Sequence, residues 1–255
     1  MSNRSGIEWT QQTWNPVIGC TKISAGCKHC YAETMSMRLK LMGIKDYEEG
    51  FKVQMLQDRV RQPLQRKKPT VYFVNSMSDL FHPEVTDAFI SDVFDVMAEA
   101  EQHTFQVLTK RSDRLREFCA GKKIPDNIWL GVSVENKRHG LPRIDDLRGL
   151  PVATRFLSVE PLLENLGAVD LTGIHWVIVG GESGHGARRM REAWVKNVHE
   201  QCIEQHVPFF FKQWGAWGAD GVRRSKKANG RLLNGREWSG YPAQVDEQML
   251  TALSG

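Results

Sequence analysis

The sequence contains no long apolar run and no strong excess of either charge. None of its apolar stretches approaches the roughly 20 residues that a membrane-spanning helix needs. The segment from Met1 to Trp14 lacks the apolar centre of a secretory signal. With 34 Lys plus Arg and 30 Asp plus Glu, the formal net charge is only +4. We therefore expect a cytoplasmic protein without membrane contact, whose net charge alone does not indicate nucleic-acid binding.

Cysteine is scarce and unevenly placed, which argues against disulfide bonds. The chain has 5 cysteines, an odd number, and its 255 residues suffice to build a core without crosslinks. Cys20, Cys27 and Cys30 lie close together, whereas Cys119 and Cys202 stand alone and are expected to be buried apolar fillers. Three neighbouring thiols in a reducing compartment indicate a metal site. The alternatives are an iron–sulfur cluster with one open iron, structural zinc with a fourth ligand from Cys119, Cys202 or a distant His, or neither of these.

Short, continuous apolar runs recur along the chain and predict a parallel sheet. They are rich in Val, Ile and Phe, as is typical of strands buried on both faces. Helical patterns over 86–100, 112–120 and 192–205 separate some of them, and the linkers 136–154 and 161–175 are expected to hold only brief helices. This alternation predicts an α/β fold, an incomplete (β/α)6-type barrel of mostly parallel strands. The expected strands are 7–14, 71–75, 105–109, 128–134, 155–159, 176–179 and 208–212.

The composition changes at Gly215, after which Gly, Trp and basic residues predominate. Asn-Gly pairs at 229–230 and 234–235 favour tight hairpin turns. We therefore expect a partial barrel over 1–214 and a C-terminal β-hairpin appendage over 215–255, with 244–255 as a short helix or frayed end. Lys and Arg outnumber Asp and Glu over 183–240, and Trp residues lie among them. This pattern suits a nucleic acid or nucleotide, or simply a solvated surface.

Polar and charged residues follow the predicted strands, at the edge where parallel α/β folds bind their ligands. We expect them to meet at one mouth. Lys110 and Glu160 would there form a structural ion-pair network or position a substrate. The full set is Ser76, Ser78, Asp79, Thr109, Lys110, Arg111, Ser133, Glu135, Glu160, Gly180, Gly181, Glu182, Lys212 and Trp214.

The cysteine cluster also carries a family resemblance. Cys27-Lys28-His29-Cys30, followed by Tyr31-Ala32, resembles a half-motif of the radical S-adenosylmethionine (SAM) superfamily, and 15–20 with 26–32 resembles its spore photoproduct lyase-like branch. Over nearly the whole chain the sequence is similar to a phage and bacterial three-cysteine-motif family of uncharacterised proteins, on 14–16, 74–82, 108–111, 180–182 and 211–215. It departs from the superfamily pattern in having six residues between Cys20 and Cys27 instead of three.

The resemblance implies a radical SAM-type enzyme. Cys20, Cys27 and Cys30 would hold a [4Fe–4S] cluster that takes an electron from a reducing donor and cleaves SAM. The resulting radical would abstract hydrogen from a substrate, with repair or modification of a nucleic acid or nucleotide as the expected reaction. Ser76, Ser78 and Asp79 would lie at the methionyl amine, Ser133 and Glu135 at the ribose, and Gly180, Gly181 and Glu182 at the adenine, with Thr109 among the cofactor contacts. Lys110 and Glu160 would be catalytic, and Arg111, Lys212 and Trp214 would contact the substrate.

Two other function classes remain open. The first is a non-catalytic, zinc- or cluster-stabilised nucleic-acid-binding protein of phage or mobile elements, which would carry zinc and cleave no SAM. The second is a redox sensor, or a subunit that is active only with a partner protein.

Overall fold

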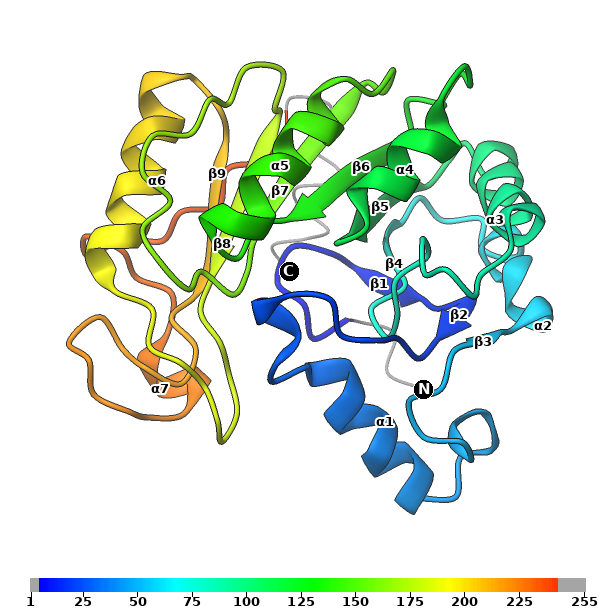
Figure 1. Ribbon diagram of the computed structural model, residues 1–255, viewed down its shortest axis with the longest axis horizontal. Coiled ribbons are helices and arrows are strands. Elements are labelled where there is room, and N and C mark those ends of the chain that lie inside the picture. The colour runs from blue at the N-terminus through cyan, green and yellow to red at the C-terminus, as the bar shows by residue number, and fades with distance from the viewer. Residues whose placement is uncertain (1–4, 243–255) are drawn as a thin grey trace.

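A curled parallel sheet forms the centre of the computed structural model, which describes residues 5–242. Within those residues the sheet has seven strands in the order β1-β4-β5-β6-β7-β8-β9, and all neighbours are parallel. Each new strand joins the same edge, as in a barrel and unlike a doubly wound sheet. The sheet curls into a half-barrel (Figure 1), so the predicted α/β fold and incomplete barrel are confirmed. The strands are β1 (Gln12–Trp14), β4 (Val71–Val74), β5 (Thr104–Thr109), β6 (Ile128–Ser133), β7 (Thr154–Val159), β8 (Trp176–Gly180) and β9 (Phe209–Gln213).

Helices connect most of the strands and follow one another along one side of the sheet (Figure 1). They are α3 (Asp87–Glu99), α4 (Ser112–Cys119), α5 (Lys137–Arg148) and α6 (Glu192–Glu204). The expectation of only a brief helix in 136–154 was wrong, because α5 has 12 residues. Asn136 caps it by accepting a hydrogen bond from the His139 amide at 3.0 Å. No helix forms in 161–175. None of the helices within residues 5–242 has the length and apolar character to cross a bilayer.

The region between β1 and β4 holds elements that the sequence pattern did not predict. Two short strands, β2 (Val17–Ile18) and β3 (Gln54–Met55), form an antiparallel pair. Helix α1 (Tyr31–Leu41) lies apart from the helices that cover the sheet (Figure 1). The remaining short helices are η1 (Ala25–Cys27), η2 (Lys45–Tyr47), α2 (Gln57–Val60) and η3 (Gln62–Gln65).

Apolar side chains are buried on both faces of the sheet. The larger cluster packs between the sheet and its helices. A second, aromatic cluster gathers Trp129, Phe156, Trp176 and Phe210, which lie in the first halves of their strands, and Trp9, which precedes β1. Trp9 contacts Trp176 edge-on at 6.1 Å between ring centroids. The strand beginnings are therefore filled by aromatic rings, and the polar groups collect at the carboxyl ends.

The segment after β9 returns to the edge of the sheet. Ser239 pairs antiparallel with Phe210, and further antiparallel bridges join Trp217 to Arg223 and Leu233 to Arg236. Leu233 is fully buried in the larger core cluster. The short helix α7 (Lys226–Asn229) lies within this segment. The division at residue 215 stays a prediction, and the helix or frayed end predicted at 244–255 lies outside the described residues.

Candidate functional site

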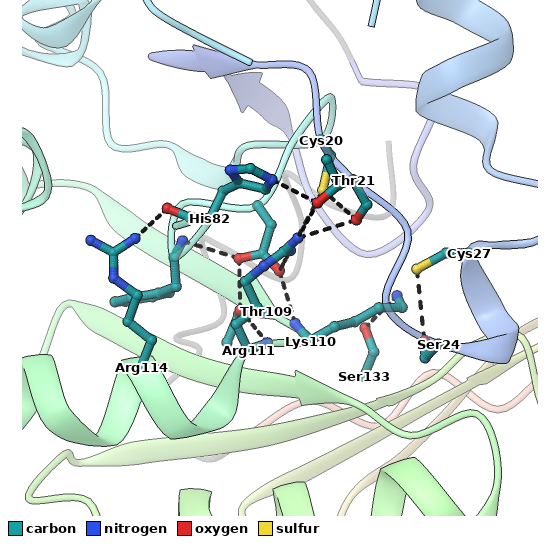
Figure 2. Close-up of polar contacts among 12 residues, drawn as sticks. Cys20, Thr21, Ser24, Cys27, His82, Thr109, Lys110, Arg111, Arg114 and Ser133 are labelled. Carbon is teal, nitrogen blue, oxygen red and sulfur yellow. Dashed lines mark hydrogen bonds and ion pairs between the residues drawn. The ribbon is translucent and has the colours of Figure 1, made fainter. Parts of the chain in front are cut away.

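The segment 19–30, here called the cysteine loop, lies against the carboxyl ends of three neighbouring strands. Figure 2 shows Cys20, Thr21, Ser24 and Cys27 along this loop, facing residues at the carboxyl ends of β5 and β6. Gly19 bridges to Ser78 beyond β4. The guanidinium of Arg111 donates to the Thr21 carbonyl at 3.1 Å. The fold thus brings the cysteines and several predicted strand-end residues into one region.

Arg111 anchors the Cys20 end of the cysteine loop. It is buried, with 7% exposure, and its Nη1 lies 3.0 Å from Asp79 Oδ2 and 3.5 Å from Cys20 Sγ. Its Nη2 also donates to Thr21 Oγ1 at 3.2 Å, and His82 Nε2 lies 2.8 Å from the same oxygen. Burial and the Asp79 carboxylate raise the pKa of the Cys20 thiol, while Arg111 opposes them. Predicted as a substrate contact, Arg111 here holds the loop.

Ser24 and Lys110 surround the Cys27 thiol. Ser24 Oγ donates to Glu135 Oε1 at 2.5 Å and lies 3.7 Å from Cys27 Sγ. Lys110 Nζ donates to Ser133 Oγ at 3.0 Å and lies 3.8 Å from Glu135 Oε1. Burial acts to raise the pKa of Cys27, but Lys110 and the hydrogen bonds from this turn outweigh it and lower the pKa below its usual value. The surroundings of Cys27 therefore make its thiolate easier to form than that of an ordinary cysteine.

Glu135 is fully buried beneath the cysteine loop. Arg143 Nη1, from α5, donates to Glu135 Oε2 at 2.7 Å and to the Ser133 carbonyl at 2.8 Å. Burial acts to raise the pKa of Glu135, but Lys110 and Arg143, helped by Ser24, lower it overall. The carboxylate predicted to lie at a ribose is thus already bound by protein donors.

The Asp79 carboxylate is likewise bound by donors from the protein. Among the described residues this carboxylate accepts four hydrogen bonds, from Thr109 Oγ1 at 2.7 Å, the Phe81 amide at 3.0 Å, the Lys110 amide at 3.1 Å and Arg111. Of its predicted companions, Ser76 Oγ donates to Asn15 Oδ1 at 3.1 Å and Ser78 Oγ to the Val17 carbonyl at 2.7 Å. These side chains bind the strand end to the chain around β2.

Glu160 and Lys212 form a separate ion pair at the ends of β7 and β9. Lys212 Nζ lies 2.8 and 3.0 Å from the two Glu160 oxygens. The Lys212 side chain is 14% exposed and the Glu160 side chain 21% exposed. Gly180 lies beneath the pair, where a Cβ would come within 3.1 Å of the Glu160 carboxylate carbon. Glu160 and Lys212 are therefore partly open to a ligand.

The end of β8 is closely packed. A Cβ on Gly181 would lie 2.0 Å from the Trp214 carbonyl oxygen. Trp214 itself is buried, and its Nε1 donates to the Leu232 carbonyl at 2.9 Å. Glu182 is bound by Arg188 through Nε at 2.9 Å, Nη2 at 2.6 Å and the backbone amide at 2.8 Å. Burial acts to raise the pKa of Glu182, but Arg188 lowers it.

A glycine permits the close approach of the cysteine loop to Glu135. A Cβ on Gly26 would lie 2.5 Å from Glu135 Cγ and 2.6 Å from Oε1. We expect Gly26→Ala to displace the loop and to lower the iron bound per chain several-fold after reconstitution with iron and sulfide. Gly149→Ala is the matched control, because its Cβ would meet nothing within 4 Å. Equal iron in the two variants would show that the loop tolerates the shift.

Several residues of the site were not predicted from the sequence. Ser24 and Gly26 lie inside the cysteine loop, and their position between cysteines is a signal that could have identified them. Arg143 and Arg188 carry no such signal, because each meets its carboxylate only through the fold.

The three thiols of the cysteine loop are donors of the type that binds zinc and iron–sulfur clusters. No group of three or more His, Cys, Asp or Glu side chains within residues 5–242 is gathered around one point. Cys20, Cys27 and Cys30 are all free thiols of intermediate burial on one loop. Arg111 beside Cys20 and Lys110 beside Cys27 supply positive charge that would offset thiolates. In donor type and charge the set fits a thiolate-bound centre.

The other two cysteines are not part of this region. Cys119 and Cys202 are buried in the larger core cluster, as predicted. Burial raises the pKa of Cys119 to about 11 and that of Cys202 to about 12. Such protonated, buried thiols are inert.

Comparisons with known proteins give a family and a distant structural likeness. A family model described as "Protein of unknown function (DUF5131)" matches residues 4–242. No curated protein matches the sequence significantly. A solved structure of spore photoproduct lyase complexed with dinucleoside spore photoproduct is similar at a TM-score of 0.41 and 12% identity, covering 74% of this chain and 59% of that one. The structure of a cysteine-to-serine mutant of the lyase is similar at a TM-score of 0.43 and 13% identity, covering 76% of this chain and 62% of that one. The chain thus spans about three fifths of the length of these structures, and a likeness of this size assigns no activity.

Proposed function

The chain belongs to the DUF5131 family, and we propose that it is a radical SAM-type enzyme whose cysteine loop holds a [4Fe–4S] cluster through Cys20, Cys27 and Cys30. The observation that carries this proposal is the placement of three free, half-buried thiols on one loop against the carboxyl ends of parallel strands. Three thiolates leave one iron of such a cluster open to a small molecule. When bound, the cluster would supply the electron that cleaves SAM and so begins hydrogen abstraction from a substrate.

Three buried carboxylates form the frame of this site. Asp79, Glu135 and Glu182 each form an ion pair with an arginine. Contact with SAM would require each to leave its arginine, and an unpaired buried charge is costly. We therefore assign these carboxylates to holding the cysteine loop and its surroundings, in place of the cofactor contacts predicted for them.

The partly exposed side chains at the mouth are the ones available to ligands. Lys110 keeps 24% exposure, and the Glu160–Lys212 pair is also partly open. Lys110 can bind a carboxylate, such as that of SAM, as a charge-assisted contact. Glu160 and Lys212 present an acceptor and a donor that can orient a polar substrate. Ser76, which is partly exposed, can add a cofactor contact without breaking an ion pair, whereas Ser133, Gly180 and Gly181 are buried.

Anaerobic reconstitution with iron and sulfide, followed by reduction in the presence of SAM, tests the proposal. The expected result is a bound cluster with formation of 5′-deoxyadenosine. Bound zinc with no SAM cleavage would replace it with the non-catalytic nucleic-acid-binding alternative.

We further propose that the substrate is a nucleic acid or nucleotide. Arg189, Arg191, Arg223 and Lys227 are exposed, and within residues 5–242 none forms an ion pair. Arg223 donates to the Gly184 carbonyl at 3.2 Å, which joins the segment after β9 to the loop after β8. That loop reaches the cysteine loop, because a Cβ on Gly186 would lie 2.6 Å from the His29 ring. The cations thus extend from the candidate site, where phosphates would follow them.

Salt dependence tests this substrate class. We expect binding of a fluorescent single-stranded oligonucleotide to weaken as salt rises. Replacing Arg189, Arg223 and Lys227 with alanine should reduce the log–log slope by about 0.7 for each lost phosphate contact. Replacing Lys67, Lys122 and Lys123, which are exposed and precede β4 and β6, removes the same charge away from the carboxyl ends of the strands and is the control. Binding that is independent of salt in the unmodified protein would exclude phosphate recognition.

A further inference from the structure

Exposed apolar side chains concentrate in one part of the described chain. Among residues 5–242, ten large hydrophobic side chains are exposed, and seven of them lie between residues 23 and 55. Grouped exposed apolar residues mark contact surfaces in soluble proteins, whereas scattered ones need no explanation. The seven are Ile23, Tyr31, Met37, Leu41, Met42, Ile44 and Met55.

Helix α1 presents the centre of this surface. Its buried residues are only Ala32 and Ser36. Met37 and Leu41 are four residues apart and so share one face, on the side of the helix away from these two. Leu41 is 88% exposed and Met42, directly after it, 64%. We call Met37, Leu41, Met42 and Ile44 the α1 ridge, and Figure 1 shows α1 standing apart from the helices of the sheet.

The charge around the α1 ridge is positive. Within residues 22–52, all of which the structure describes, Lys28, Arg38, Lys40 and Lys45 have no ion pair. The carboxylates there are mostly neutralised, with Glu33 bound to Lys22, Glu49 to Lys52 and Asp46 to Arg59, which leaves Glu48. Arg38 and Lys40 lie between Met37 and Leu41 in the sequence of α1. This surface therefore complements an acidic protein, whereas a second copy of the chain would bring like charges together.

Helix α1 connects the α1 ridge to the candidate cluster site, with Leu41 about 16 Å along the helix axis from Cys30. Cys30 is the residue directly before α1, at the N-cap position of the helix. Lys22 of the cysteine loop is bound to Glu33 of α1 at 2.7 Å. A protein that docks on the α1 ridge and extends along α1 toward Glu33 would reach the cysteine loop.

We infer that the α1 ridge docks an acidic protein carrying a one-electron donor, a reduced flavin or iron–sulfur group. This inference rests on the proposed function, which requires an electron from outside. In the step, the carrier is oxidised by one electron and the cluster is reduced by one, and no atom or proton is transferred. The apolar ridge supplies the central contact, and the lysines and arginine around it select for acidic partners.

Binding of two acidic probes, a flavodoxin and a [2Fe–2S] ferredoxin, tests the inference. We expect at least one to bind the protein with an affinity that falls as salt rises. Leu41→Asp should weaken that binding at least tenfold and slow cluster reduction by the probe. Reduction by dithionite, which needs no docking, should stay unchanged. Ile203→Asp, at a 56% exposed position on α6, is the matched control.

Three results would overturn the inference. They are no binding of either probe, equal affinity in Leu41→Asp and Ile203→Asp, and a dimer that Leu41→Asp converts to a monomer in sedimentation, which would make a second copy the occupant. The probe-binding assay needs no cluster, so failure of the proposed function is distinguishable. If dithionite and SAM give no 5′-deoxyadenosine but probe binding still depends on Leu41, the docking surface stands and the electron transfer is refuted.

Discussion

Replacing Cys27 with alanine is expected to reduce 5′-deoxyadenosine formation to background and to remove most of the bound iron. Loss of a partner outside the ligand shell typically costs 10–100-fold in metal affinity or activity, so loss of a ligand should exceed about 100-fold. Cys27 is also the thiol whose pKa is lowered by its surroundings, chiefly Lys110. Iron content and nucleoside yield after anaerobic reconstitution measure both effects.

The remaining cysteines supply the control for this prediction. Cys119 and Cys202 are buried in the core, away from the cysteine loop. Replacing both with alanine should leave iron content and SAM cleavage unchanged, with only a modest loss of stability. Iron binding that survives in Cys27→Ala, or disappears in the double variant, would show that the ligands have been assigned incorrectly.

Breaking the Glu135–Arg143 ion pair should cause the largest loss of stability. Glu135 is fully buried and Arg143 nearly so, with their side chains 2.7 Å apart. Arg143→Met would leave the Glu135 carboxylate without its buried partner, which costs about 3–5 kcal/mol of unfolding free energy. Chemical denaturation at neutral pH measures this loss.

A double variant separates charge pairing from simple packing loss. Glu135→Gln combined with Arg143→Met removes both charges and should recover part of the stability lost in Arg143→Met. A double variant as unstable as the sum of the two single variants would show that the ion pair itself contributes little.

Acid should weaken the same pair. The pKa of Glu135 is lower in the folded protein than in the unfolded chain, so its stabilisation is present above the unfolded pKa near 4.3. It is lost as the pH falls through the folded pKa, because the carboxyl then protonates in both states. The stability of Glu135→Gln should accordingly depend less on pH in this acidic range.

The strand and helix pattern was predictable because it is local. Val71–Val74 and Trp176–Gly180 are continuous apolar runs, and α3 carries an apolar stripe with helical spacing. Helix α5 was underestimated because it contains Pro142 and buries few apolar side chains. Helix α1 was missed for a similar reason, since its core side is small and its apolar residues do not form a single buried stripe.

The sequence by itself determined the alternating strands and helices and the three closely spaced cysteines, because both depend on residue type and short spacing. Only the tertiary structure decided which charges meet. Arg143 reaches Glu135 from α5, Arg111 joins Asp79 to Cys20, and Glu160 meets Lys212 from strands separated by 52 positions. Such contacts are set by the curling of the sheet and the close approach at Gly26, which no local pattern records. The same holds for the exposed face of α1, since exposure is defined only once the rest of the chain has packed.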